Sequence, residues 1–562
     1  MLKTALTGLA AAIAVVMLLL AWLGFTPRQM LAMVSRPAAG SLAQAPGEAQ
    51  PTTFASTVPP RHARSGLETL DYGVIALYLC GMLVVGGWAG RGVKSARSLF
   101  LAGERMNYVL VGISLLGAYL SALTMMGLPG MAYGRHDWTY MVQLPWLVLT
   151  GAVIVGWILP RYRAAGVVSI YEYLERRQHV AVRLLASTSF LVFAVGRLGL
   201  VLYLPSLAFH TVTGFPLAWC IVIAGVAVTV YTALGGLKAA IWTDLAQVLI
   251  FIGGSLLMLH SIIGEIGPAR FVDIGLACNK FRLLALDPDV RQITTWWLIL
   301  ETIYQTIRIY GTQQDMAQLY LSTASTARAA RSVWMSVLLY IPLGFLFYFL
   351  GTAFFAFYQV FPDPALPPKP DQILPYFAVH HLPAGVAGLV LAAIFAAAMS
   401  SIDACMNAAS TVCVEDFARR FSRRARPDRF YLRLARGLIL FWGALMIAAG
   451  LLFMKVQYAQ IMWGKVMGVC TNGVLGLMLL AFLPFRVDWR ASVFGFALGY
   501  LSLALAVRGE INFLLWPVIG NTVCLVSALL AHALLKAATK PPAPPERDIA
   551  LRPGRDGATI PP

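Results

Sequence analysis

Two hydroxyl residues in a long apolar segment, residues 382–414, have a spacing that suggests ion chemistry. If this segment is a helix, Ala397, Ser400 and Ser401 stand at positions i, i+3 and i+4, so both hydroxyls project from one face beside the Ala397 carbonyl. A hydroxyl that bonds to a carbonyl one turn earlier bends the helix, and a carbonyl freed beside two hydroxyls suits a small hard cation. Serine in membrane helices also packs against neighbours and satisfies itself, so the spacing alone leaves both interpretations open.

An arginine lies deep in another apolar segment. Arg197 follows Arg183 by fourteen residues, which is about 21 Å of helix and beyond easy reach of the membrane surface. A buried guanidinium requires an anion, and its planar fork fits a carboxylate. The anion is either the carboxylate of a solute or a structural partner such as Glu301 or Asp403.

Helix-weakening residues interrupt a third apolar segment, residues 109–131. Gly117, Gly127 and Pro129 lie in it, together with the hydroxyl residues Ser121 and Thr124. A span broken at membrane depth is tolerated where it is buried in protein or lines a cavity, and in transporters the loosened carbonyls bind ions and solutes. The alternative is a Gly/Ser surface that packs against neighbouring helices.

Two further polar residues lie at the ends of apolar segments. Gly235 and Gly236 predict a tight turn, and Asp244 followed by Gln247 resembles the start of a helix. Asp244 is therefore either the N-cap of a helix or a negatively charged ligand of a second cation. Gln143, which opens the segment that ends at Pro160, is a candidate amide donor.

The composition indicates a membrane protein that crosses the bilayer many times. Hydrophobic residues make up 59% of the chain, charged residues 12%, and the mean hydropathy is +0.73. These values exclude a soluble globular protein. About fourteen apolar segments are long enough to be candidate spans, one of them N-terminal.

The positive charge predicts topology. The net charge is +18, but the basic residues gather in every second loop, which places those loops and the C-terminus in the cytoplasm and excludes a nucleic-acid partner. The seven cysteines have no paired spacing, so neither a disulfide framework nor a zinc site is expected.

The chain divides into four parts. Residues 1–25 form an N-terminal transmembrane anchor or signal-like helix, and residues 26–68 form a disordered extracytoplasmic linker rich in Pro, Ala and Gln. Residues 69–537 contain the remaining apolar segments. Residues 538–562 form a basic, Pro-rich cytoplasmic tail.

Two long motifs resemble those of the sodium/solute symporter family. The first is Tyr-Thr-x-x-Gly-Gly-Leu-Lys-Ala-x-x-Trp-Thr-Asp-x-x-Gln at residues 231–247, and the second covers residues 396–407. The resemblance extends over residues 70–535. It implies an all-α, polytopic membrane protein of the LeuT-like fold, with two inverted five-helix repeats, about 13 core transmembrane helices and one N-terminal helix. The segments 109–131 and 296–310 would be the broken first helices of the repeats.

The resemblance also implies site residues. The principal sodium site would use the carbonyls of Gly117, Leu120 and Ala397 and the hydroxyls of Ser400 and Ser401. Within the family the chain is most similar to bacterial sodium-coupled sialic acid symporters, whose solute-binding residues correspond to Ser121, Thr124, Gln143 and Arg197.

Two departures from the family pattern change the expectations. In a second sodium site of some relatives, the aspartate is retained as Asp244, but a serine pair is replaced by Asp403 and Ala404. Asp244 and Asp403 are candidates for a second cation site. Asp403 could instead take a proton or pair with Lys465, whose ammonium would then replace the second sodium. The altered motif at residues 313–320 is expected in a cytoplasmic loop, where it would affect gating.

These observations predict sodium-coupled symport of a carboxylate-bearing solute into the cell, with Na+ as the coupling ion and sialic acid as the first candidate. The Gly-Leu-Pro sequence at residues 127–129 also resembles the monocarboxylate branch, so a carrier of small monocarboxylates or another solute is the alternative. A transporter-like sensor is an alternative of a different class, although the tail is short; no enzyme activity is expected. The expected partners are the bilayer of the cytoplasmic membrane and the solute, and a monomer is the working expectation.

Overall fold

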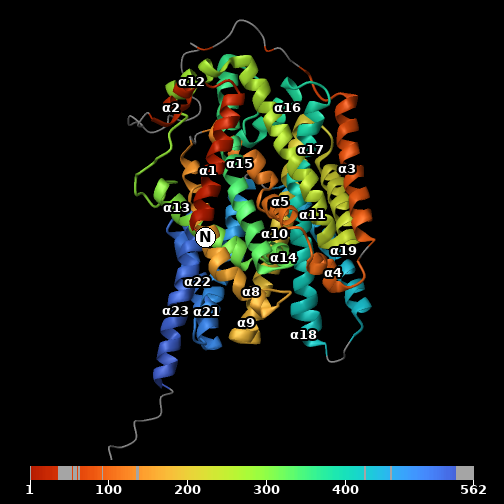
Figure 1. Cartoon of the computed structure of the whole chain (residues 1–562), viewed down its shortest axis with the longest axis vertical. Coiled ribbons are helices and arrows are strands. Elements are labelled where there is room, and N and C mark those ends of the chain that lie inside the picture. Colours follow the sequence, from red (N-terminus) through yellow and green to blue (C-terminus); the bar gives the residue numbers. More distant parts are fainter. Residues whose placement is uncertain are drawn as a thin grey trace, which may run out of the picture.

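The computed structural model describes residues 2–35, 54, 60, 64–91, 93–134, 138–422, 426–455 and 459–538. Long helices run roughly along the long axis of the molecule (Figure 1). Most of the expected linker, most of the expected tail and the side chain of Lys465 lie outside the described residues.

The helices of the first half are α1 (Leu2–Trp22), α2 (Pro27–Ser35), α3 (Thr69–Gly90), α4 (Ala96–Leu101), α5 (Tyr108–Tyr119), α6 (Ala122–Tyr133), α7 (Trp146–Val153), α8 (Leu159–Ala165), α9 (Tyr171–Arg177), α10 (Val180–Thr213), α11 (Leu217–Ile266) and α12 (Pro268–Ala277). Those of the second half are α13 (Thr295–Thr312), α14 (Gln314–Leu321), α15 (Thr326–Val360), α16 (Ile373–His381), α17 (Val386–Val412), α18 (Arg419–Phe421), α19 (Asp428–Phe453), α20 (Ala459–Cys470), α21 (Val474–Phe482), α22 (Trp489–Arg508) and α23 (Trp516–Ala538). Short 3₁₀ or π segments are η1 (Ala102–Glu104), η2 (Trp138–Gln143), η3 (Ile154–Ile158), η4 (Pro370–Gln372), η5 (Cys413–Ala418) and η6 (Phe513–Leu515).

The membrane spans agree with the composition. Within the described ranges, nine helices are long and apolar enough to cross a membrane, or up to eleven if each of two bent helix pairs is one span. Helix α13, which carries Glu301, Gln305 and Arg308, is not among the nine. The expected number of helices, about fourteen, therefore stays a prediction.

The expected turn inside residues 217–263 is confirmed. Helix α11 changes direction at Gly236, whose φ of 57° and ψ of −150° are not helical. A Cβ at this position would lie 2.4 Å from Leu99 Cδ1, so both the backbone angle and the contact require glycine. The helix resumes directly after Gly236, which places Asp244 in its buried interior. The interpretation of Asp244 as the start of a helix was wrong.

The first expected broken helix is present, whereas the expected second one, residues 296–310, is continuous and a break follows it. Helices α5 and α6 are separated by Leu120 and Ser121, which have extended backbone angles, and the chain bends there by 55°. Helices α13 and α14 are separated by the extended residue Gln313. The pattern of basic loops suggested that residues 313–320 form a cytoplasmic loop, but the structure contradicts this expectation. These residues belong to this second break and to α14, whose residues are buried against α5 and α17.

The N-terminal segment is more ordered than expected. Helix α1 is followed by a bend of 119° and by α2, which occupies residues that were expected to belong to the disordered linker. Helix α2 forms because its apolar side chains find partners: Met30 and Met33 are buried, and α2 packs against α12. Phe25 makes edge contacts with the rings of Phe271 and Phe349.

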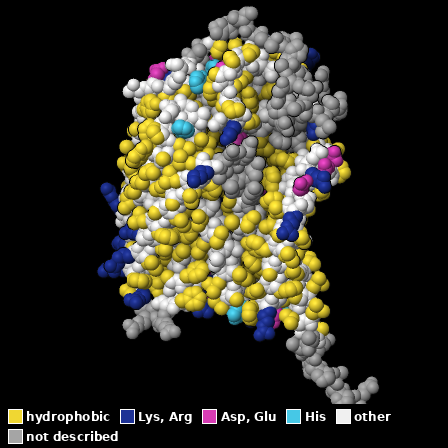
Figure 2. Space-filling model, turned by 180° about the vertical axis from the view of Figure 1, so that it is seen from behind, with side chains coloured by type: hydrophobic (Ala, Val, Ile, Leu, Met, Phe, Trp, Pro, Cys, Tyr) yellow, Lys and Arg dark blue, Asp and Glu magenta, His cyan; other side chains and the backbone are white. Residues whose placement is uncertain are grey.

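The two ends of the molecule differ in charge. Helices α8, α9 and α18, in or beside the basic loops, lie at the lower end in Figure 1, and α23 runs down toward the same end. Figure 2 shows a largely hydrophobic surface, with many of the Lys and Arg side chains toward the lower end. The basic loops of the described residues therefore gather at one end of the molecule.

A buried carboxylate ties α3 to the start of α17 at the upper end. Asp71 Oδ1 accepts hydrogen bonds from the backbone N–H groups of Gly385 and Gly388, both at 2.8 Å. Asp71 Oδ2 accepts from Arg64 Nη2 at 2.7 Å, and Arg64 Nη1 also donates to the Leu382 carbonyl at 3.0 Å. These bonds join two helices that are more than 300 residues apart in the chain.

Another buried carboxylate ties η5 to α10 at the lower end. Asp416 accepts from Arg183 Nη2 at 2.6 Å and from the hydroxyls of Ser169 and Ser187 at 2.8 and 2.6 Å. Arg183 also pairs with Glu175 on α9 at 2.7 Å. Burial would raise the pKa of Glu175, but hydrogen bonds from Arg183 and Arg420 lower it, so this carboxylate remains charged.

Replacing Asp416 with alanine is expected to lower the free energy of unfolding by about 3 kcal/mol, because it leaves the buried Arg183 guanidinium short of an anion. The matched control is Glu172→Gln, which removes a carboxylate from a partly exposed pair with Arg176 and is expected to cost less than about 1 kcal/mol. Thermal unfolding of both purified variants in detergent measures the difference. Equal midpoints for the two variants would contradict the structural role of Asp416.

Candidate functional site

The C-terminal end of α5 is held by α17. Ser401 Oγ donates to the Leu120 carbonyl at 2.9 Å and lies 3.4 Å from the Ala118 carbonyl. The expectation that a serine hydroxyl bonds back within its own helix and bends it was wrong. Helix α17 is continuous through these residues, and the Ser401 hydroxyl reaches across to the carbonyls that the break in the other helix leaves unpaired.

Gly117 and Ser400 complete this contact. A Cβ at Gly117 would lie 2.5 Å from Ser400 Oγ, so only glycine lets the two helices approach this closely. Ser400 Oγ is buried, faces Asp244 and has no hydrogen-bond partner of acceptable geometry. Ala397 is buried one turn earlier on α17. The structure thus brings together the helix segments that carry all five residues expected at the principal cation site, and it leaves one hydroxyl oxygen without a partner.

Arg197 is paired within the protein. Its Nη1 donates to Asp315 Oδ2 at 2.7 Å, and its Nη2 donates to the Ala118 carbonyl at 3.1 Å. The partner is neither Glu301 nor Asp403, the two carboxylates suggested from the sequence. Asp315 was missed because its segment was assigned to a loop. The Arg197 side chain remains 8% exposed, whereas Asp315 is completely buried.

Asp244 and Asp403 lie beside the principal site. Asp244 accepts a hydrogen bond from the Ser114 hydroxyl, and Asp403 Oδ2 accepts one from Tyr231 Oη at 2.9 Å. The two carboxylates are close enough to repel each other. Neither forms an ion pair with a described residue, and Oδ1 of each is buried without a hydrogen-bond partner. The nearby Gln247 Oε1 is also unpartnered.

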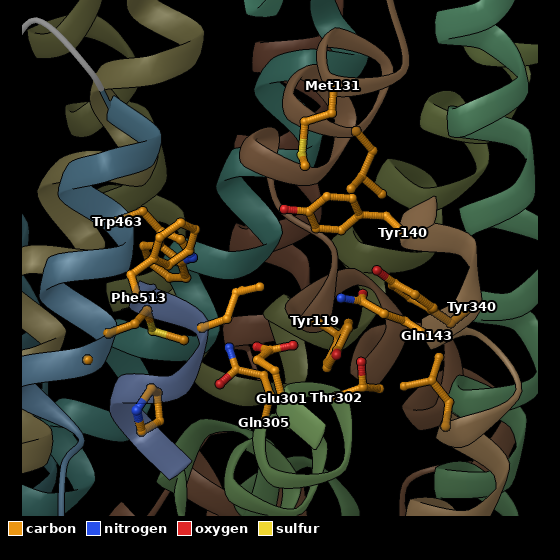
Figure 3. A pocket seen from close by; sticks show the side chains of 16 residues that line it. Tyr119, Met131, Tyr140, Gln143, Glu301, Thr302, Gln305, Tyr340, Trp463 and Phe513 are labelled. Atoms are coloured by element: carbon orange, nitrogen blue, oxygen red, sulfur yellow. The ribbon is translucent and has the colours of Figure 1, made fainter. Parts of the chain in front are cut away.

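A cavity of about 200 Å³ lies next to the two broken helices. Figure 3 shows Glu301 and Gln305 projecting into it, with Gln143 and Tyr340 on the opposite side. The lining residues are Tyr119, Leu128, Met131, Tyr140, Gln143, Leu147, Glu301, Thr302, Gln305, Tyr340, Trp463, Met467, Gly468, Phe513, Leu514 and Pro517.

The expected solute-binding residues are only partly brought together around this cavity. Gln143 lines it, whereas Ser121, Thr124 and Arg197 do not. Ser121 and Thr124 lie at the start of α6, where Thr124 Oγ1 accepts from the Ser121 N–H at 3.4 Å. They are part of the same broken helix as Tyr119 and Leu128, which do line the cavity.

The sequence analysis did not identify the polar side of α13 as part of a site. Glu301, Thr302 and Gln305 line the cavity, and Arg308 follows one turn later. The signal was present, because positions 301, 305 and 308 fall at i, i+4 and i+7 and therefore share one helix face. Polar residues on one face of an otherwise apolar span indicate a surface turned toward a cavity or other protein.

Replacing Gly117 with alanine is expected to separate α5 from α17, because the new Cβ would lie 2.5 Å from Ser400 Oγ. Overpacking of this kind costs about 1–3 kcal/mol, so the midpoint of thermal unfolding should fall. The matched control is Gly253→Ala on α11, where nothing lies within 4 Å of the new Cβ; its midpoint should not fall. If Gly117→Ala is as stable as the parent, the close contact between the helices is absent.

The chain is similar to several known transport proteins. The sodium/sialic acid symporter SiaT of Proteus mirabilis is 28% identical over 483 residues, which are 84% of this chain and 96% of SiaT. The human sodium-coupled monocarboxylate transporter 1 is 30% identical over 463 residues, covering 78% of this chain and 74% of that protein. A solved structure of a Na+-coupled sialic acid symporter in a substrate-bound, outward-open state has a TM-score of 0.77 and 27% identity, covering 83% of this chain and 98% of that chain.

The solved structures confirm the expected LeuT-like architecture. The model of the sodium:solute symporter family matches residues 99–499, well over half of the chain. This range contains both broken helices, α17 and Arg197. The protein belongs to the sodium:solute symporter family.

Proposed function

We propose that the protein is a sodium-coupled symporter that carries a carboxylate-bearing organic solute into the cell, with sialic acid as the first candidate. The observation that best supports this function is the contact of Ser401 with the carbonyl end of α5, beside the unpartnered Ser400 hydroxyl. The similarity to sialic acid symporters supports the choice of solute. Similarity to the monocarboxylate transporter makes small monocarboxylates the alternative.

The residues of the principal site suit Na+. The carbonyls of Gly117, Leu120 and Ala397 and the hydroxyls of Ser400 and Ser401 form an all-oxygen set, as a hard cation requires. Without an ion, Ser401 satisfies the Leu120 carbonyl and Ser400 remains unsatisfied. Sodium would be coordinated by both hydroxyl oxygens. It would also be coordinated by the Leu120 carbonyl oxygen, in place of the hydrogen bond from Ser401.

Arg197 is the proposed anchor for the solute carboxylate, with Ser121, Thr124 and Gln143 as further contacts. The Ala118 carbonyl that accepts from Arg197 also lies 3.4 Å from Ser401 Oγ. One peptide group therefore touches both the proposed anion site and the proposed sodium site. A sodium ion that fixes the end of α5 would also fix the position of the guanidinium.

This shared contact provides a physical basis for coupling. An ion that bridges α5 and α17 binds only the conformations in which these helices are close, so it shifts the population toward them. If the same conformations present Arg197 to the solute, each ligand raises the affinity for the other by the same factor.

The proposed location is the cytoplasmic membrane, with the C-terminus in the cytoplasm. The basic loops and the end of α23 lie at the same end of the molecule (Figure 1). The positive-inside rule then places this end in the cytoplasm.

Arg197→Lys is expected to raise the KM for N-acetylneuraminate at least about 30-fold, because lysine keeps the charge opposite Asp315 but lacks the bidentate fork. Uptake into proteoliposomes with an inward sodium gradient measures this effect. The matched control is Arg97→Lys, at a surface arginine that is 60% exposed. An unchanged KM in a folded Arg197→Lys variant would assign Arg197 a structural role only.

We also propose a second cation site between Asp244 and Asp403. Two carboxylates in apolar surroundings without a cation are costly, and the unpartnered oxygens of both, with that of Gln247, form an oxygen-only set. The family relatives' serine pair is replaced here by Asp403 and Ala404, so this site would carry one more negative charge. The alternatives are a proton on Asp403 or an ion pair with Lys465.

If the second cation is sodium, Asp403→Asn is expected to change the dependence of uptake on sodium concentration from sigmoidal to hyperbolic. The change follows because an amide removes the charge that holds the second ion but leaves the principal site intact. The Hill coefficient of uptake measures this outcome, with Lys465→Gln as the companion variant. A hyperbolic parent would exclude two cooperative sodium ions and favour the proton or Lys465.

A further inference from the structure

Glu301 has an unusual position for a carboxylate within a membrane protein. It lies on α13, and its side chain projects into the cavity beside the broken helices (Figure 3). It forms no hydrogen bond or ion pair with any other residue of the described ranges. Asp315, in contrast, is paired directly with Arg197. All of the accepting oxygens of Glu301 therefore remain available to a molecule in the cavity.

A positive group lies near Glu301, although the oxygens of Glu301 are unoccupied. Arg308 lies two turns further along α13, about 10 Å in helix rise, and its attraction offsets part of the cost of burying the Glu301 carboxylate. Arg308 is 1% exposed, and its Nε and Nη2 donate to Gln305 Oε1 at 3.2 and 2.7 Å. With the pair of Arg197 and Asp315, this part of the protein contains two guanidinium groups and two carboxyl groups, whose charges cancel when both carboxyl groups are ionised.

Neutrality decides which kind of group Glu301 would recognise. An ammonium group in the cavity would leave an excess positive charge in a low-dielectric region, which is unfavourable. Hydroxyl groups satisfy a carboxylate by donating hydrogen bonds and add no charge. A solute carboxylate accompanied by one sodium ion also adds no net charge. The electrostatics therefore favour a hydroxyl-bearing acid over an amine.

The other lining residues fit the same chemistry. The amides of Gln143 and Gln305 and the hydroxyl of Thr302 can both donate and accept. Trp463, Phe513 and Met467 provide apolar surface for carbon-bound hydrogens. A short monocarboxylate has too few hydrogen-bond donors to satisfy Glu301. Its entry into the cavity would remove water from the Glu301 carboxylate without replacing the hydrogen bonds that the water donated.

We propose that Glu301 is a specificity-determining residue that accepts hydrogen bonds from hydroxyl groups of the solute, so that the solute is a polyhydroxylated acid and not a short monocarboxylate. This inference rests on the proposed sodium-coupled transport of a carboxylate. It adds Glu301 to the proposed binding residues, and it adds the recognition of solute hydroxyl groups, which neither Arg197 nor the sodium site explains.

The test compares the parent with Glu301→Gln in proteoliposomes with an inward sodium gradient. Glutamine has nearly the same shape but loses the charge and one accepting oxygen. The KM for N-acetylneuraminate should rise about 10- to 100-fold, the range for lost hydrogen bonds to a charged group, while kcat changes less than about two-fold. Glu172→Gln, at a partly exposed carboxylate, is the matched control and should behave as the parent.

A hydroxyl-deleted analogue separates a direct contact from a structural effect. The analogue lacks the solute hydroxyl that donates to Glu301. Its KM in the parent should equal the KM of N-acetylneuraminate in Glu301→Gln. In the variant, removal of the same hydroxyl should cause no further loss. Thermal unfolding in detergent without solute checks that Glu301→Gln remains folded.

Three results would overturn the inference. The first is an unchanged KM in Glu301→Gln, and the second is parent uptake of lactate but of neither N-acetylneuraminate nor gluconate; both leave the proposed transport of carboxylates intact. The third is competition by an aminated acid that is lost in Glu301→Gln, which would assign Glu301 to a cationic group. If the parent shows no sodium-driven uptake of any of these acids, the proposed function fails, and the inference fails with it.

Discussion

The end of α5 imposes the constraint on which the central part of the structure depends. The last carbonyl groups of a helix have no partners within the helix, and in a membrane protein water cannot satisfy them. Here Ser401 from α17 and Arg197 from α10 supply the donors. Three helices are therefore fixed relative to one another at the point where the chain is broken. Gly117 permits this approach, because any side chain there would displace the Ser400 hydroxyl.

Buried polar groups near this point fall into two groups. Arg197 pairs with Asp315 Oδ2, and Arg183 pairs with Asp416 near the lower end, and these ion pairs hold helices together, although Asp315 Oδ1 remains without a hydrogen-bond partner. Ser400, Asp244 and Asp403 also retain oxygen atoms without partners, and none of the three forms an ion pair with a residue of the described ranges. Unsatisfied buried oxygen atoms are costly unless a cation or a donor compensates them. The locations of these atoms thus identify where an ion or a solute gains the most free energy by binding.

The sequence allowed the apolar spans, the turn at Gly235 and Gly236 and an interruption somewhere in residues 109–131 to be predicted, because each depends on local composition, but it did not give the position of the break. It also allowed Gly117, Leu120, Ser400 and Ser401 to be grouped, but only through family motifs, since their contact joins helices about 280 residues apart. The pairing of Arg197 with Asp315 was not predictable, because it depends on how α14 packs after the second break. Glu301 was visible as an unusual residue, yet its access to a cavity depends on neighbours from several helices.

The hydrogen bonds of Asp71 have a mechanical consequence. They attach the N-terminal end of α17 to α3, while the middle of α17 is attached to α5. Sliding α17 along α3 would remove the Gly385 and Gly388 donors from the buried Asp71 carboxylate and leave its Oδ1 unsatisfied, at a cost of about 1–3 kcal/mol. A conformational change is therefore least costly if α3 and α17 move as one rigid body. The extended residues Leu120, Ser121 and Gln313, which separate helices, are then the expected positions of the rotation.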